Sequence, residues 1–343
     1  MDRKIALEEH VSSPHIPSVK TRRDLYERFD ADFMKNVERR LRDIDQRLAD
    51  MDAYGIEHAI VSLTVPSVQG IQDPVAATAA ARAANDCVAE HYTAAHPDRF
   101  SAFATVAIQD PAAAGVELER AVNDLGMCGA MINGYSDLGP GVVRYLDEEP
   151  VREFWARVAK LNVPVYLHPR EPIPGPGRRI YDGYPGMVGS AWGYALETAT
   201  HALRLMLSGV FDDHPNLTVI LGHLGEGLSY LLPRAEHRLS VQARGLGRDR
   251  HKRPLPHYLR NNFYFTTSGF FNTPTLRDAV DAIGIDRVLF STDYPYEDMA
   301  WASDWFDNAD IPEGHRTRIG RSNAMRLFGF RENPKSGQQP AVA

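Results

Sequence analysis

The sequence predicts an α/β fold in which a single (β/α)8 barrel, a TIM barrel, takes up almost the whole chain. Eight short apolar runs recur along the 343 residues, and a longer stretch of helical character follows each of them. The runs are continuous in Val, Ile, Leu and Phe rather than alternating with polar residues, which is typical of parallel strands that helices cover. Barrels of this kind reach about 250 residues or more as one domain, so the length does not require two.

The eight expected strands alternate with eight expected helices. The strands are expected at residues 4–8, 58–63, 100–107, 128–133, 163–168, 217–223, 262–269 and 287–293. The helical stretches cover residues 40–55, 76–96, 111–126, 150–162, 195–214, 227–242, 273–284 and 314–329. Gly55, Gly126 and Gly284 stand where a left-handed residue would end a helix and turn the chain into the next strand.

Other folds fit the motifs less well. A doubly wound open sheet is the alternative, but no G-x-G-x-x-G follows the first strand and no G-x-x-x-x-G-K-[ST] occurs. No linker divides the chain, and the segment 171–190, rich in Pro and Gly, is expected to be a long loop at the catalytic end of the barrel. We therefore expect one barrel domain over residues 1–330 and a flexible tail over residues 331–343.

The composition argues against several classes of protein. A formal net charge of −7 argues against a protein that binds the negatively charged phosphates of nucleic acid. No stretch approaches the roughly 20 apolar residues that a membrane helix needs. The first residues show no secretory signal, and the two cysteines, Cys87 and Cys128, have no metal-binding spacing. These features favour a cytoplasmic protein with reduced thiols and no membrane partner.

Candidate functional side chains gather where the expected strands end. In a barrel, catalytic side chains stand at the carboxyl ends of several different strands. The residues at these ends are Glu8, Glu9, His10, Asn133, His168, His223, Thr267, Ser268 and Asp293. Because residues two apart on a strand share one side, Glu8 and His10 point to the same place, whereas Glu9 points away.

Glu8, His10, His168 and Asp293 form a mixed set of imidazoles and carboxylates, with His223 close by. Such ligands suit zinc, manganese or iron. Two carboxylates and two neutral imidazoles would neutralise a divalent ion and leave coordination positions for a chelating substrate or a water. The sequence therefore predicts a divalent metal site in the mouth of the barrel.

Four motifs carry a resemblance to a known family. They are KIALEEH, VPVYLHPR, ILGHLGEG and RVLFSTDYPYE, at the first, fifth, sixth and eighth strands. They resemble the metal-dependent aromatic acid decarboxylases of the amidohydrolase superfamily, the family of γ-resorcylate (2,6-dihydroxybenzoate) and 2,3-dihydroxybenzoate decarboxylases. The likeness extends from about Lys4 to Phe330 and implies an amidohydrolase-type TIM barrel. Glu-x-His on the first strand favours this branch, because hydrolytic amidohydrolases commonly have His-x-His there.

Carried over position by position, the resemblance implies roles for individual residues. The metal ligands would be Glu8, His10, His168 and Asp293. The catalytic residues would be Asp293, His223 and Glu226; the last two, three residues apart at the expected start of a helix, can hydrogen-bond to each other. Arg234 would lie near the substrate or at a subunit contact. The expected substrate-binding residues are Arg234, Asn133, Tyr296, Trp192 and Tyr194.

These expectations define a reaction and its alternatives. We expect a metal-dependent, non-oxidative, reversible decarboxylase of an ortho-hydroxybenzoate such as 2,6-dihydroxybenzoate, 2,3-dihydroxybenzoate or salicylate, which protonates the ring and then releases CO2. The alternative is a metal-dependent hydrolase, for example a lactonase, in which Asp293 activates water; a non-catalytic binding barrel is the third. The expected cofactor is one divalent metal ion (Zn, Mn or Mg) without an organic cofactor. The expected partners are a small aromatic carboxylate and further copies of the chain, in a tetramer or dimer.

Overall fold

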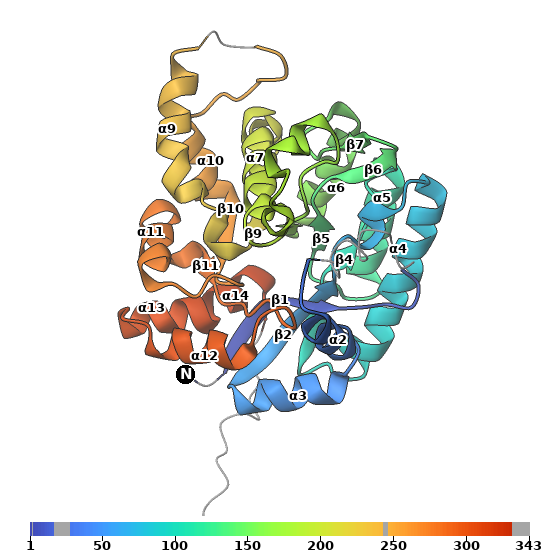
Figure 1. Cartoon of the computed structure of the whole chain (residues 1–343), viewed down its shortest axis with the longest axis vertical. Coiled ribbons are helices and arrows are strands. Elements are labelled where there is room, and N and C mark those ends of the chain that lie inside the picture. Colours follow the sequence, from blue (N-terminus) through green and yellow to red (C-terminus); the bar gives the residue numbers. More distant parts are fainter. Residues whose placement is uncertain (2, 17–27, 243–245, 331–343) are drawn as a thin grey trace, which may run out of the picture.

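The protein, seen in a computed structural model that describes residues 1, 3–16, 28–242 and 246–330, has parallel strands at its centre and helices around them (Figure 1). The strands are β1 (Lys4–Val11), β2 (Ile56–Leu63), β3 (Phe100–Ala102), β4 (Ala104–Thr105), β5 (Ala130–Asn133), β8 (Val165–His168), β9 (Val219–Leu221), β10 (Phe263–Thr266) and β11 (Val288–Leu289). The predicted α/β barrel is confirmed. The predicted tail at residues 331–343 lies outside the described residues.

The central strands pair in two parallel ladders. One ladder has the order β1-β2-β3, and the other has the order β11-β10-β9-β8-β5-β4. The change of partner occurs at Phe103, whose amide donates to the carbonyl of Val61 on β2 over 2.9 Å. The next amide, of Ala104, donates over 2.8 Å to the carbonyl of Gly129, just before β5. The single strand predicted at residues 100–107 is therefore broken in two, and each part serves one ladder.

Individual hydrogen bonds replace the ladder between β1 and β11. The amide of His10 donates to the carbonyl of Tyr294 over 2.7 Å, and the amide of Glu8 donates to Oγ of Ser291 over 2.6 Å. Across the parts of the chain that the structure describes, no ladder joins these two strands. We call this place, where residues 8–10 face residues 291–294, the seam of the barrel.

Helices cover the outside of the strands. They are α2 (Ala31–Arg40), α3 (Ile44–Ala53), α4 (Pro74–Val88), α5 (Pro111–Asn123), α6 (Arg152–Leu161), α7 (Gly193–Leu207), α8 (Val210–Asp213), α9 (Leu228–Ser240), α10 (Leu255–Asn262), α11 (Thr273–Ile283), α12 (Met299–Asn308), α13 (Glu313–Thr317) and α14 (Asn323–Phe328). An Asp or Asn side chain caps α3, α4, α5 and α11 by accepting an amide of the first turn. Gly55, Gly126 and Gly284 all have positive φ, but ψ of 147° places Gly284 outside the left-handed helical region that was predicted for it.

Some elements interrupt the regular alternation and are not among those that the sequence predicts. They are α2, α10, α12 and an antiparallel hairpin of β6 (Ser136–Gly139) and β7 (Val142–Arg144). Helices α9 and α10 pack against each other and project from the barrel as an arm (Figure 1). Among the described residues, no helix combines the length and the apolar character needed to cross a membrane.

The interior of the barrel is packed beneath its mouth. Side chains from the strands fill it, namely Ile5, Leu7, Ile60, Phe103, Met131, Tyr166, Ile220 and Leu289. A larger apolar cluster fills the space between the strands and the helices. The polar residues at the strand ends therefore rest on a close-packed layer, which limits how far they can move.

Candidate active site

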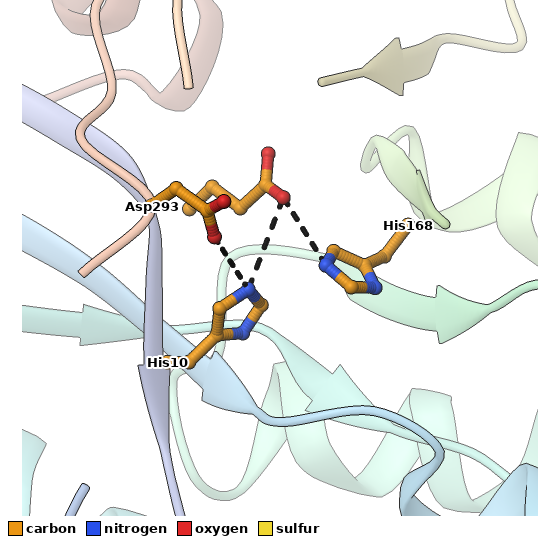
Figure 2. Close-up of side chains that lie close together, drawn as sticks. His10, His168 and Asp293 are labelled. Carbon is orange, nitrogen blue, oxygen red and sulfur yellow. Dashed lines mark ion pairs between the residues drawn. The ribbon is translucent and has the colours of Figure 1, made fainter. Parts of the chain in front are cut away.

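The four predicted metal ligands come together at the carboxyl ends of three strands. Glu8 and His10 lie on β1, His168 ends β8, and Asp293 follows β11. One ligand atom of each residue lies within 4.8 Å of all the others. Nε2 of His10 is 3.2 Å from Oδ1 of Asp293, and Nε2 of His168 is 3.2 Å from Oε1 of Glu8. Figure 2 shows His10, His168 and Asp293 pointing toward a common centre.

This cluster has the chemistry of a divalent cation site. Oε1 of Glu8 and Nε2 of His10 are buried, yet neither forms a hydrogen bond of good geometry with any residue that the structure describes. Buried polar atoms without such partners are costly unless another group satisfies them. Two imidazoles and two carboxylates are ligands that zinc and manganese accept, so the residues present fit the predicted metal ion.

The charges within this buried cluster influence one another. Burial raises the pKa of Glu8, but the positive charge of His223 and the closeness of His10 and His168 outweigh it and hold the pKa well below its ordinary value. Burial lowers the pKa of His10, whereas Asp293 and Glu8 act in the opposite direction and raise it to about 9. Burial lowers the pKa of His168. Glu8 is therefore negatively charged, which is the state that binds a cation.

Glu8 is held by hydrogen bonds on the oxygen that faces away from the other ligands. Its Oε2 accepts from the hydroxyl groups of Tyr166 and Ser268, and the Tyr166 hydroxyl also lies 2.8 Å from Oγ1 of Thr266. With Oε2 engaged in this way, Oε1 stays directed at His168. Tyr166 is not among the residues predicted from the sequence. The signal was present, because Tyr166 stands two residues before His168 and so shares its side of the strand.

We expect Tyr166→Phe to raise the dissociation constant for Mn²⁺ about tenfold, because Glu8 loses a donor that fixes its carboxylate. A titration of the metal-free protein with Mn²⁺ would measure this. Tyr258→Phe on α10 is the matched control, since the Tyr258 hydroxyl is also hydrogen-bonded, to Asp212 over 2.7 Å, but contacts no candidate ligand. Equal affinities of the two variants would contradict the assigned role of Tyr166.

The predicted His223–Glu226 pair forms, but it does not lie on a helix. Nδ1 of His223 donates to Oε1 of Glu226 over 2.7 Å. The expectation of a helix start is wrong, because α9 begins only at Leu228 and the pair lies in a tight turn before it. His223 and Glu226 have left-handed φ values of 52° and 57°. Such a backbone cannot continue a helix and costs on the order of 1–3 kcal/mol per residue.

His223 faces Asp293 across the mouth of the barrel. Its Nε2 lies 3.6 Å from Oδ2 of Asp293. Burial lowers the pKa of His223, but the negative charges of Glu226 and Glu8 and the contact with Asp293 raise it well above its ordinary value. Gly269, with φ of 61°, passes so close that a Cβ there would lie 3.0 Å from Cδ2 of His223. The His223 imidazole is thus held beside the side chain of Asp293, an arrangement that can hold or transfer a proton.

Three of the predicted substrate-binding residues border the ligands or the segments that carry them. The ring of Tyr296 lies edge-on to His10, with 5.7 Å between their centroids. Asn133 pairs in register with His168, and its buried Oδ1 has no hydrogen-bond partner within the described part of the chain. Tyr194 is buried and donates to Oε2 of Glu171 over 3.5 Å, three residues beyond His168.

The other two predicted substrate-binding residues lie at the surface of the chain. Trp192 is 53% exposed, because it stands at the N-cap of α7, where the long loop ends. Its predicted role in lining an aromatic pocket stays a prediction. Arg234 is exposed on the arm helix α9, whose buried residues Leu228 and Leu232 lie on a different face. Its predicted role, near the substrate or at a subunit contact, stays a prediction.

The comparisons with known proteins agree with this geometry. A family model described as Amidohydrolase matches residues 14–330. The chain is 50% identical to a γ-resorcylate decarboxylase of Rhizobium sp. (strain MTP-10005) over 330 residues, which are 96% of this chain and 98% of the relative. A crystal structure of 2,6-dihydroxybenzoate decarboxylase complexed with 2,6-dihydroxybenzoate has a TM-score of 0.90 at 50% identity and covers 96% and 100% of the two chains.

A second solved structure includes a metal ion. It is a dihydroxybenzoic acid decarboxylase from Polaromonas sp. JS666 with bound manganese and the inhibitor 2-nitroresorcinol, and it has a TM-score of 0.90 at 45% identity, covering 96% and 97% of the two chains. All these relatives are decarboxylases, so the hydrolase alternative loses its support. The chain belongs to the amidohydrolase family and, within it, to the γ-resorcylate decarboxylase family of metal-dependent carboxy-lyases.

Proposed function

We propose that this chain binds one divalent metal ion, manganese in the first place, and catalyses the reversible, non-oxidative decarboxylation of 2,6-dihydroxybenzoate to resorcinol and CO2. The observation that carries the proposal is the buried cluster of four ligand residues within 4.8 Å of one another, next to the His223–Asp293 pair. The substrate bound to one relative and the manganese bound to another support the choice of ring and of metal.

The decarboxylation of an aromatic ring requires an acid in the mouth of the barrel. Direct loss of CO2 would leave an electron pair in the plane of the ring, where the π system cannot delocalise it. Protonation of the carboxyl-bearing carbon removes this obstacle. A C–H bond forms there, the C–C bond to the carboxylate breaks, and its electron pair restores the aromatic ring while CO2 leaves. A bound divalent ion supplies a chelating centre for the carboxylate and the adjacent hydroxyl oxygen.

Asp293 is the residue that we assign as the proton donor to the ring carbon. It takes a proton from the ortho hydroxyl of the substrate on binding, delivers that proton to the ring, and the phenolate product regains one from water. His223 holds the phenolic oxygen through Nε2, since its Nδ1 is engaged by Glu226 over 2.7 Å. The buried carboxylate of Glu226 keeps the imidazole in one orientation.

The walls of the ring pocket are assigned to residues beside the ligands. Tyr296 lies edge-on to His10 and offers an apolar face to an aromatic substrate. Tyr194 is buried near the same loops, and Asn133 lies next to His168, where its amide can bond to a ring substituent. These three residues would set which pattern of ring hydroxyl groups is accepted.

Product analysis tests the proposal directly. The purified protein, freed of metal and reloaded with Mn²⁺, Zn²⁺ or Mg²⁺, is incubated separately with 2,6-dihydroxybenzoate, 2,3-dihydroxybenzoate and salicylate. We expect CO2 and resorcinol from the first substrate, with the highest rate for the manganese form. Turnover of only one of the other acids would overturn the substrate assignment. Absence of CO2 from all three would overturn the reaction itself.

The proposal includes the cellular compartment and the oligomeric state of the enzyme. We infer a cytoplasmic homo-oligomer, a tetramer or dimer, in which the exposed Arg234 of the arm helix α9 contacts a neighbouring subunit. Both cysteines, Cys87 and Cys128, are free thiols, as a reducing compartment would keep them. Light scattering coupled to size-exclusion chromatography measures the mass of the assembly, and a monomeric mass would contradict this inference.

A further inference from the structure

Glu9 points away from the metal ligands, yet it binds the segment that carries one of them. Its carboxylate is fully buried. Oε1 accepts a hydrogen bond from the amide of Thr292 over 3.0 Å, and the Thr292 hydroxyl lies 2.9 Å from Oε1 and 2.8 Å from Oε2. Oγ1 of Thr292 in turn accepts from the amide of Tyr294 over 3.3 Å. Glu9 is thus connected to the residues on both sides of Asp293.

Asp293 needs such support because its backbone is unusual. Its φ is 67°, in the left-handed region that a residue with a side chain adopts only when its surroundings impose it. On its C-terminal side, the carbonyl of Asp293 accepts the amides of Tyr296 and Glu297 over 2.9 and 3.1 Å. On its N-terminal side, the corresponding anchor is the set of bonds between Thr292 and Glu9.

These bonds lie in the seam, where the ladder between β1 and β11 is missing. Arg47 of α3 also connects the two sides of the seam. It is fully buried, donates to the carbonyl of His10, and lies 4.4 Å from the centroid of the Tyr294 ring. Hydrogen bonds of side chains therefore supplement the backbone bond from His10 to Tyr294 and take the place of a continuous ladder at the seam. They hold the ligands of β1 at a fixed distance from Asp293.

We propose that Glu9 is a positioning residue that places the Asp293 carboxylate against His10 and the bound metal by fixing Thr292 across the seam. The inference rests on the proposed function, since it concerns the same metal site. A seam bond with a purely structural role would lower the thermal stability and leave the metal affinity of the folded protein unchanged. A positioning role changes the affinity itself.

The test compares two variants with matched controls. Glu9→Gln and Thr292→Val each remove hydrogen bonds of the seam while keeping the size of the side chain. Glu117→Gln is a control because Glu117 is also a buried carboxylate with hydrogen bonds, to Asn85 and Arg120, but lies on α5. Thr105→Val is a control because its buried hydroxyl bonds only to Ser67 on the described part of the chain. Mn²⁺ binding is followed by electron paramagnetic resonance, and melting temperatures are recorded for all variants.

We expect Glu9→Gln and Thr292→Val to raise the dissociation constant for Mn²⁺ about 10- to 100-fold and to change the spectrum of bound Mn²⁺, whereas both controls keep the wild-type values. Thr292→Ser, which retains the hydroxyl, should restore most of the affinity. Wild-type affinity in folded Glu9→Gln and Thr292→Val would overturn the inference. If Thr292→Val does not fold, Glu9→Gln decides alone. Failure of the wild-type protein to bind Mn²⁺ would instead overturn the proposed function.

Discussion

Asp293→Asn is expected to lower kcat for 2,6-dihydroxybenzoate about 10³- to 10⁴-fold. An amide has no acidic proton to give to the ring carbon, and general acid catalysis contributes about 10²- to 10⁴-fold in enzymes. The asparagine keeps an oxygen at 3.2 Å from His10 in the present geometry, so part of the metal binding should survive. Initial rates at saturating Mn²⁺, together with metal content per chain, separate loss of the acid from loss of the ion.

His58→Gln is the control for this experiment. His58 lies on β2, far along the strand from its carboxyl end, and its ring nitrogens bond to the carbonyl of Asp98 and, over 2.9 Å, to Oγ of Ser101. We expect kcat of the His58→Gln variant to stay within about twofold of the wild-type value. His58 lies toward the amino-terminal ends of the strands, the face of a barrel that contributes to stability and not to catalysis. Comparable losses in the two variants would mean that position at the strand end does not identify the catalytic residues.

Removal of the metal should have the second large effect. Treatment with a chelator is expected to abolish decarboxylation, and addition of Mn²⁺ should restore it, because the carboxylate and hydroxyl of the substrate then regain their chelating centre. The metal should also stabilise the fold, by about 2.7 kcal/mol when free Mn²⁺ is 100 times its dissociation constant. Rate assays and thermal melts before and after reloading measure both effects. Full turnover in protein that elemental analysis finds free of metal would contradict a metal-dependent reaction.

Much of the barrel could be predicted from the sequence because its strands are short apolar runs with ligand residues at their ends. The break at Phe103 could not, since both halves of that strand are apolar and only the choice of hydrogen-bond partner separates them. The meeting of Glu8, His10, His168 and Asp293 followed from the rule that strand ends share one mouth. The hydrogen bonds that hold Glu8 in place, from Tyr166 and Ser268, did not follow from this rule.

The residues that the sequence did not reveal are those whose role depends on a neighbour. Alternation along β1 gives the direction of Glu9 but not the presence of Thr292 in its path. The turn at His223 and Glu226 looks like a helix start in the sequence, because left-handed φ at residues other than glycine leaves little trace in composition. Arg234 was expected near the substrate or at a subunit contact, and a pattern within one chain cannot decide between the two.

The order of the ligands along the chain has a consequence for how the enzyme matures. Glu8 and His10 on β1 and His168 on β8 are made before Asp293, which follows β11. Until then the ladder that begins at β1 has no partner at the seam, and the cluster lacks one of its two carboxylates. A nascent chain therefore cannot assemble the complete ligand set. The set of four ligands is therefore complete only when β11 has been made and the barrel has closed at the seam.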